Sequence, residues 1–164
     1  MKRIIYPGTF DPIHNGHIDI AIRVSKLFDE LIFVVAENSI KNPLFNPDER
    51  IKMIKDSTAK YKNIKAVQYS GLIVDFAKEC NAIAVIRGLR QVSDFEFEFQ
   101  MAMMNYHLHP KLTSLFMMPD EKYIHINSTV IKDVARHNGD IDLYVPENVK
   151  KYLISKNFSK KKLS

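Results

Sequence analysis

The segment Tyr6-Pro-Gly-Thr-Phe-Asp-Pro-Ile-His-Asn-Gly-His17 is the clearest guide to the fold class, because it joins a short apolar run to a helical pattern through a Gly/Pro turn. The run, Ile4-Ile5-Tyr6, is typical of a buried strand. After the turn, apolar residues recur at helical spacing, at positions 18, 21, 22, 24 and 27. A strand that leads directly into a helix is the first part of an α/β unit.

The turn itself is suited to bind an anion. Gly8 allows a tight exit from the strand where a side chain would collide. The free N–H groups of the helix start, together with the positive end of its dipole, form a seat for phosphate. His14 and His17 stand three residues apart at that seat and can both donate hydrogen bonds to one anion.

Two other readings of the histidines remain open from the residues alone: polar residues of a turn, or two ligands of a metal site. A His-x-x-His pair lacks the spacing and the general-base Glu of the zinc motif His-Glu-x-x-His. Moreover, no Cys/His cluster elsewhere in the sequence supplies further ligands. These observations favour phosphate over zinc.

The rest of the chain alternates between apolar runs of strand length and helical patterns. Further strands are predicted at 31–36, 64–69, 82–86 and 113–118. Helices are predicted from Asn46, over 72–80, from a capping box at Ser93 to about His107, from Ser128 to His137, and over 146–156. Hairpin turn signals are absent from the sequence. The pattern predicts a doubly wound, five-stranded parallel sheet of the Rossmann-like α/β class.

In such a sheet, ligands bind beyond the carboxyl ends of the strands. Candidate residues follow all five predicted strands, so they are expected to share one edge: Thr9 and Phe10, Lys41, Ile73, Arg87 to Arg90, and 123–129. Arg87 and Arg90 bracket Gly88, and arginine is suited to bidentate phosphate recognition. Lys41 lies in a polar loop, where a solvated lysine is the default interpretation.

The helix predicted from Ser128 has two compatible readings. Ser128 can be its N-cap, which is a structural role. The same helix start, with Thr129 and Lys132 nearby, would also receive the outer phosphates of a nucleotide.

Composition limits the remaining classes. The chain has 164 residues, of which 46% are hydrophobic and 26% charged, as expected for one globular domain, and we predict that this domain spans 1–158. The net charge of +5 is more than accounted for by six lysines after residue 147, so 159–164 is predicted to be a flexible basic tail. A basic groove with interleaved aromatics is not visible, so no nucleic-acid partner is expected.

Neither a secretory signal nor an apolar run long enough to span a bilayer occurs in the sequence. A cytoplasmic protein without membrane contact is therefore expected. Cys80 is the single cysteine, so an internal disulfide is impossible. It lies in a helical pattern, which favours an inert buried thiol.

Gly8-Thr9-Phe10-Asp11-Pro12 followed by His14-Asn15-Gly16-His17 resembles the signature of the His-x-Gly-His or Thr-x-Gly-His nucleotidyltransferases. These enzymes transfer a nucleotidyl group from a nucleoside triphosphate without a covalent intermediate. Three further segments and the chain length resemble the phosphopantetheine adenylyltransferases: Ile86–Glu98, Gln100–Asn105 and Pro146–Val149. The resemblance runs from about Lys2 to Ile154.

This resemblance implies a reaction, a cofactor and an assembly. The reaction is that of ATP with 4′-phosphopantetheine to give dephospho-coenzyme A and pyrophosphate, with Mg²⁺ and without a metal held directly by the protein. The implied assembly is a homohexamer. A helix beginning at Ser93 fits such an assembly, because it carries two apolar stripes, one with Phe95 and Phe99 and one with Phe97 and Met101.

The resemblance also implies roles for individual residues. His17, Lys41 and Arg90 are the catalytic set, with His17 stabilising the transition state. Thr9, Lys41, Ile73 and Arg87 would bind the acceptor. The implied ATP site consists of Thr9, Phe10, His14, His17, Gly88, Leu89, Arg90, Glu98, Tyr123, Ile124, His125, Ile126, Asn127, Ser128 and Thr129.

Two positions depart from the usual pattern of that family. His14 stands where Thr is frequent, and Asn127 stands where Ser is usual. An amide at position 127 leaves backbone contacts intact but removes any hydroxyl contact.

Two alternatives remain from the sequence. The nicotinate- or nicotinamide-mononucleotide adenylyltransferases share Gly-Thr-Phe-Asp-Pro-x-His-x-Gly-His, although the Arg87–Glu98 block and the short chain favour phosphopantetheine as acceptor. A regulatory module that binds a nucleotide without turnover is the other alternative.

Overall fold

A computed structural model describes residues 1–36 and 42–156. Its centre is a parallel five-stranded sheet in the order β3-β2-β1-β4-β5. The strands are β1 (Arg3–Gly8), β2 (Glu30–Ala36), β3 (Ile64–Tyr69), β4 (Ala84–Gly88) and β5 (Thr113–Met117). The strand order reverses between β2 and β4, on either side of β1, which is the doubly wound Rossmann-like arrangement predicted from the sequence.

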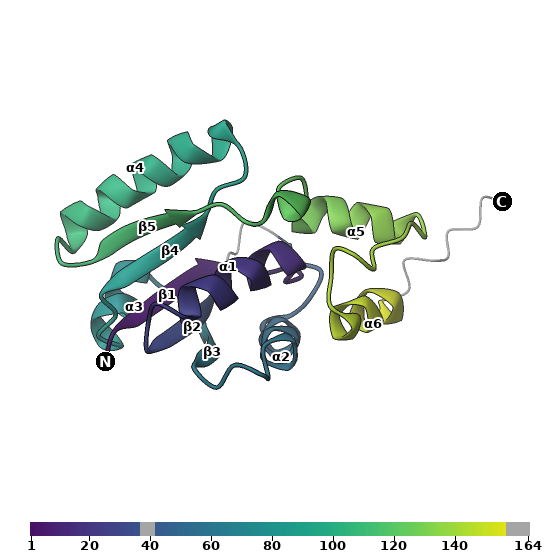
Figure 1. Cartoon of the computed structure of the whole chain (residues 1–164), viewed down its shortest axis with the longest axis horizontal. Helices are drawn as coiled ribbons and strands as arrows, with labels where there is room; N and C mark the ends of the chain where they lie inside the picture. Colours follow the sequence, from purple (N-terminus) through teal and green to yellow (C-terminus); the bar gives the residue numbers. More distant parts are fainter. Residues whose placement is uncertain (37–41, 157–164) are drawn as a thin grey trace.

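Six α-helices and one 3₁₀ turn connect and flank the described strands (Figure 1). They are α1 (Asn15–Ser25), α2 (Pro47–Ser57), α3 (Ile73–Glu79), α4 (Val92–Leu108), η1 (Glu121–Tyr123), α5 (Ser128–Arg136) and α6 (Glu147–Ser155). Figure 1 shows α5 and α6 beyond the carboxyl ends of the central strands, whereas α4 runs alongside the edge strand β5.

Successive side chains of each strand point to opposite faces of the sheet, so the apolar core is divided into two clusters. On β1, Ile4 and Tyr6 belong to the larger cluster, which also contains residues of α1, α2, α5 and α6. Ile5 points to the opposite face and packs with Val74 and Ala77 of α3. Because both faces are covered, the central strands are apolar throughout, as a parallel sheet requires.

The helix starts differ from prediction at two places. The N-cap of α4 is Gln91 and the helix begins at Val92, so the capping box predicted at Ser93 is wrong. The N-cap of α5 is Asn127, whose side chain accepts a hydrogen bond from the Val130 N–H at 2.9 Å, and not Ser128. Asn and Ser are both good N-caps, so local sequence does not separate adjacent candidates.

Gly8 is required for a close approach of Phe10. A Cβ atom at position 8 would lie 2.7 Å from Cζ of the Phe10 ring, so the predicted collision is confirmed. Phe10 adopts a positive φ of 49°, which is uncommon for a residue with a Cβ. Its ring is 3% exposed and packs edge-on against Tyr6 and Phe33. The turn after β1 is thus anchored in the core.

The helices of residues 1–36 and 42–156 include none of the length and apolar character needed to span a membrane. The basic tail predicted for 159–164 lies outside the described residues, as does Lys41.

Candidate active site

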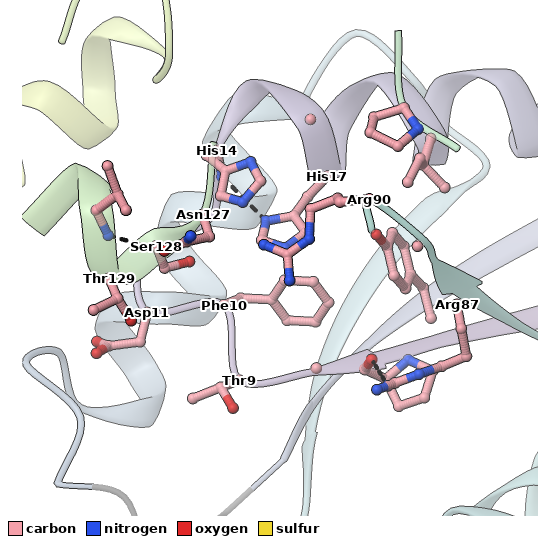
Figure 2. A pocket seen from close by; sticks show the side chains of 18 of the residues that line it. Thr9, Phe10, Asp11, His14, His17, Arg87, Arg90, Asn127, Ser128 and Thr129 are labelled. Atoms are coloured by element: carbon pink, nitrogen blue, oxygen red, sulfur yellow. Dashed lines mark hydrogen bonds between the residues drawn. The ribbon is translucent and has the colours of Figure 1, made fainter. Parts of the chain in front are cut away.

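A cavity of about 720 Å³ opens at the carboxyl ends of β1 and β4. Its walls come from four parts of the chain: the turn after β1 with the start of α1, the segment before α2, the loop after β4 with α4, and the start of α5. Figure 2 shows the labelled side chains of the first, third and fourth parts facing a common space. The predicted edge of the sheet is therefore hollowed where the strand order reverses.

His17 is held in one tautomer at this cavity. Its Nδ1 accepts the backbone N–H of His14 at 3.3 Å, so in the neutral ring the proton is on Nε2 (Figure 2). Burial lowers the pKa of His17 well below its ordinary value of 6.5, and the neighbouring His14 and Arg90 lower it further. At neutral pH, His17 is a neutral hydrogen-bond donor.

His14 is stacked on this ring. The centroids of the His14 and His17 rings are 3.7 Å apart with an angle of 25° between the planes. His14 is only 2% exposed, and neither of its ring nitrogens has a hydrogen-bond partner among residues 1–36 and 42–156. Burial lowers the pKa of His14 to about 3. His14 is thus a neutral imidazole buried in the wall of the cavity.

Arg87, at the end of β4, is bound within the protein. Its Nε and Nη2 form a bidentate pair with the Glu98 carboxylate of α4 at 2.7 and 2.5 Å, and its Nη1 donates to the Pro7 carbonyl at 2.6 Å. These bonds join β4, α4 and the end of β1. Glu98 offsets the charge of the guanidinium, which keeps it from being an unpaired cation.

Arg90 makes longer contacts within the protein than Arg87 does. Its Nη1 donates to the Ile126 carbonyl at 3.4 Å, and its Nε lies 3.4 Å from the Asp94 carboxylate. About one third of its side chain is exposed. Arg90 therefore keeps donors for an anion in the cavity.

The N-terminus of α5 forms the opposite wall. The Ser128 hydroxyl donates to the Pro12 carbonyl at 2.8 Å and so joins this helix to the turn after β1. Thr129 and Lys132 line the cavity from the same helix, and Lys132 pairs with Asp11 at 2.5 Å. The first N–H groups of a helix favour a negatively charged ligand.

Most of the residues predicted from the sequence lie together in this cavity. It is lined by Thr9, Phe10, His14, His17, Arg87, Gly88, Arg90, Glu98, Asn127, Ser128 and Thr129. The structure does not bring Ile73, Leu89 or Tyr123–Ile126 to its wall. Ile73 instead packs on the core of the other face, and the Leu89 N–H bonds to the Met117 carbonyl at 3.0 Å.

Sequence reasoning missed several residues that line the cavity, and Tyr6 and Asp11 are the two with titratable side chains. Tyr6 was assigned only to a strand, yet its ring lines the cavity. Burial raises the pKa of its hydroxyl, so this group remains protonated. Asp11 was quoted only as part of the signature, yet its carboxylate faces the same space. Its position directly after Phe10 was the signal that could have identified it.

The described residues offer no metal site of their own. No group of three or more His, Cys, Asp or Glu side chains in residues 1–36 and 42–156 is placed to hold an ion. Asp11 is occupied by Lys132 and two backbone N–H groups.

Comparison of the chain with protein families and with solved structures agrees with this geometry. A family model described as cytidylyltransferase-like matches residues 5–134, which is well over half of the chain. The chain belongs to this family, and the nucleotidyltransferase class predicted from the sequence is confirmed.

One solved structure shows the same fold over the full length. It is described as "a Putative Nicotinate-nucleotide Adenylyltransferase from Vibrio parahaemolyticus". The TM-score is 0.74 at 18% identity, and the match covers 100% of this chain and 99% of the other. At this identity the match supports the fold and does not select the acceptor substrate.

The two stacked histidines are expected to make the stability of the folded protein sensitive to acid. The pKa values of His14 and His17 are lower in the folded than in the unfolded protein. Their contribution to the free energy of unfolding is therefore complete above about pH 6.5. It is lost as the pH falls, because the imidazoles take up protons in the unfolded chain. Each histidine contributes a slope of up to about 1.4 kcal/mol per pH unit. We expect His14→Thr to reduce the slope of the unfolding free energy between pH 6 and 5, measured by urea denaturation.

The matched control is His137→Asn, because the His137 side chain is 78% exposed. This control should keep the wild-type slope. An unchanged slope in His14→Thr would show that the buried imidazole is protonated in the folded protein.

Proposed function

We propose that this protein transfers the adenylyl group of ATP to 4′-phosphopantetheine, releasing dephospho-coenzyme A and pyrophosphate. The observation that supports catalysis most directly is the neutral, tautomerically fixed His17 in one cavity with Arg90 and the N-terminus of α5. Support for the acceptor comes from the resemblance of Ile86–Glu98 and Gln100–Asn105 to the phosphopantetheine adenylyltransferases.

The reaction requires two anions to meet. An oxygen of the acceptor phosphate attacks the α-phosphorus of ATP, and the bond to the bridging oxygen breaks, so that its electron pair leaves with pyrophosphate. A phosphate monoester is largely ionised at neutral pH, so no general base is needed. The barrier arises from charge repulsion and from the charge that develops on the transferred group.

The cavity supplies donors for that charge at fixed positions. Because the His17 ring is neutral, its Nε2–H donates a hydrogen bond without acting as an acid toward the substrate. Arg90 and the N–H groups at the start of α5 add positive potential from other elements. Donors that are already in place need no reorganisation in the transition state.

The Arg87–Glu98 pair suits the neutral part of the proposed acceptor. The carboxylate offsets the guanidinium charge, while two N–H groups of the guanidinium remain beyond the three used within the protein. Such a group can donate to amide oxygens of a pantetheine arm. Phosphate would be recognised elsewhere, and Thr9 is the described candidate at the end of β1.

The proposed reaction uses Mg²⁺ that enters the cavity bound to the nucleotide. Bound to the phosphates of ATP, it would neutralise charge on the leaving pyrophosphate. The side chains that would face that complex are Lys132, Ser128 and Thr129 of α5.

Nicotinate-mononucleotide adenylyl transfer is a second candidate. It is favoured by the description of the Vibrio parahaemolyticus structure and by His14, which is shared with that group of enzymes. Both candidates use the same nucleotide chemistry and differ only in the acceptor.

A homohexamer is the assembly we propose, and α4 supports a partner surface. Phe97, Met104 and Tyr106 of this helix are 60%, 55% and 60% exposed. Within the described residues, α4 packs chiefly on the edge strand β5. A group of exposed apolar side chains on one helix is typical of an interface.

Removal of the His17 imidazole is expected to lower turnover without unfolding the protein. His17→Ala should reduce kcat by on the order of 10²–10³, as for the loss of one preorganised donor to a developing charge. Pyrophosphate release under saturating substrates measures this, with circular dichroism to verify folding. Wild-type turnover in this variant would refute the role of His17.

The acceptor is tested by pyrophosphate release with ATP and one candidate at a time. We expect turnover with 4′-phosphopantetheine and little with nicotinate or nicotinamide mononucleotide. Preference for either mononucleotide would select the second candidate. Binding of ATP without turnover on any of the three would indicate a nucleotide-binding module.

The assembly is tested by light scattering on the purified protein. The expected mass is six times the 19.0-kDa chain, and Phe97→Glu should lower it, because a charge would be buried in the interface. Leu27→Glu is the matched control, since Leu27 is 68% exposed and lies outside α4. A monomeric wild-type protein would contradict the proposal.

A further inference from the structure

Asp11 joins three separate segments at the wall of the cavity. Its Oδ1 accepts the Phe45 N–H and its Oδ2 accepts the Leu44 N–H, both at 2.9 Å. Oδ2 also accepts from Nζ of Lys132 at 2.5 Å. The carboxylate is 5% exposed and belongs to the turn after β1, whereas its partners belong to the segment before α2 and to α5.

A carboxylate in a cavity built for anions needs an explanation. Unpaired, it would repel a phosphate, since like charges a few ångströms apart interact strongly where water is partly excluded. Here the two backbone N–H groups and the ammonium satisfy it. The pair of Asp11 and Lys132 carries no net charge, so it does not weaken the positive potential of the α5 N-terminus.

The pairing restricts a flexible side chain. Lysine has four rotatable bonds and loses rotamer entropy when it is fixed. Lys132 is held at the cavity wall by Asp11 before any ligand arrives, and only 18% of its side chain is exposed. The Ser128 hydroxyl attaches the same helix to the Pro12 carbonyl at 2.8 Å, next to Asp11. Two contacts therefore fix α5 relative to the turn.

Lys132 retains binding capacity in this arrangement. An ammonium group has three N–H donors, and Asp11 takes one of them. The other two remain for phosphate oxygens beside the N–H groups of α5.

We propose that Asp11 is a positioning residue that holds Lys132 and the start of α5 for the pyrophosphate end of the nucleotide. The inference rests on the proposed function in that it takes ATP as the nucleotide. It does not depend on which acceptor is used.

The test compares three ligands that share parts of ATP. Isothermal titration calorimetry measures binding of ATP, pyrophosphate and AMP to the full chain and to Asp11→Asn. We expect binding of ATP and pyrophosphate to weaken about 10- to 100-fold, the range for hydrogen bonds to charged groups. AMP lacks the outer phosphates, so its affinity should change less than about twofold.

Lys132→Met and the double variant separate positioning from a general structural role. Lys132→Met should show a larger selective loss, because it also leaves Asp11 as an unpaired carboxylate that repels phosphate. In that background Asp11→Asn should reduce the loss and not add to it, because its own effect passes through the lysine. Parallel weakening of all three ligands, or an additive double variant, would overturn the proposal.

Folding is followed by thermal unfolding, since loss of a buried pair can destabilise the protein. If Asp11→Asn does not fold, Asp11→Glu keeps the charge but displaces the carboxylate by one methylene, and the same selective loss is expected. Unchanged pyrophosphate affinity in Asp11→Glu and in Lys132→Met would refute the inference. Asp142→Asn, which breaks an ion pair with Lys150 outside the cavity, is the control and should leave all three affinities unchanged.

The result is distinguishable from failure of the proposed function. Binding of pyrophosphate and AMP requires no acceptor, so the test remains informative even if 4′-phosphopantetheine is not adenylylated.

Discussion

The pairing of β1 with β2 on one side and with β4 on the other places this strand at the centre of the sheet and positions the cavity. The connection after β1 leads to β2 on one side, whereas the connection after β4 leads to β5 on the other, so the two loops diverge and open the cavity. The close approach of Phe10 to Gly8 then anchors the turn in the core. The first turn of α1 is thereby fixed at the cavity, with His17 on it.

The electrostatics of the cavity follow from pairing and burial. Arg87 is matched by Glu98, Lys132 by Asp11, and the two histidines are kept neutral. Helix N-termini and the donors left on the paired cations provide the remaining attraction for an anion. Such a site offers directed hydrogen bonds to a phosphate without a large concentration of unpaired charge, which would be costly to keep beside an apolar core.

Much of this could be predicted from the sequence, because it depends on local pattern. Apolar runs of strand length and Gly/Pro turns identified the five strands, and the signature from Gly8 to His17 identified the nucleotidyltransferase class. Details that depend on competition between neighbours were not predictable. Asn127 and Ser128 are both good N-caps, and only the Pro12 carbonyl, distant in sequence, draws the Ser128 hydroxyl away from capping.

The doubly wound sheet and the residues that follow each strand were predictable before folding was considered, since both depend on hydrophobic periodicity and on turn chemistry encoded within a few residues. Which side chains meet depends on how the folded chain packs. The stack of His14 on His17 and the bonds from Asp11 to Lys132 and to the Leu44 N–H join groups whose distances depend on how helices pack. Burial sets the protonation of the histidines, and burial exists only once the chain has folded.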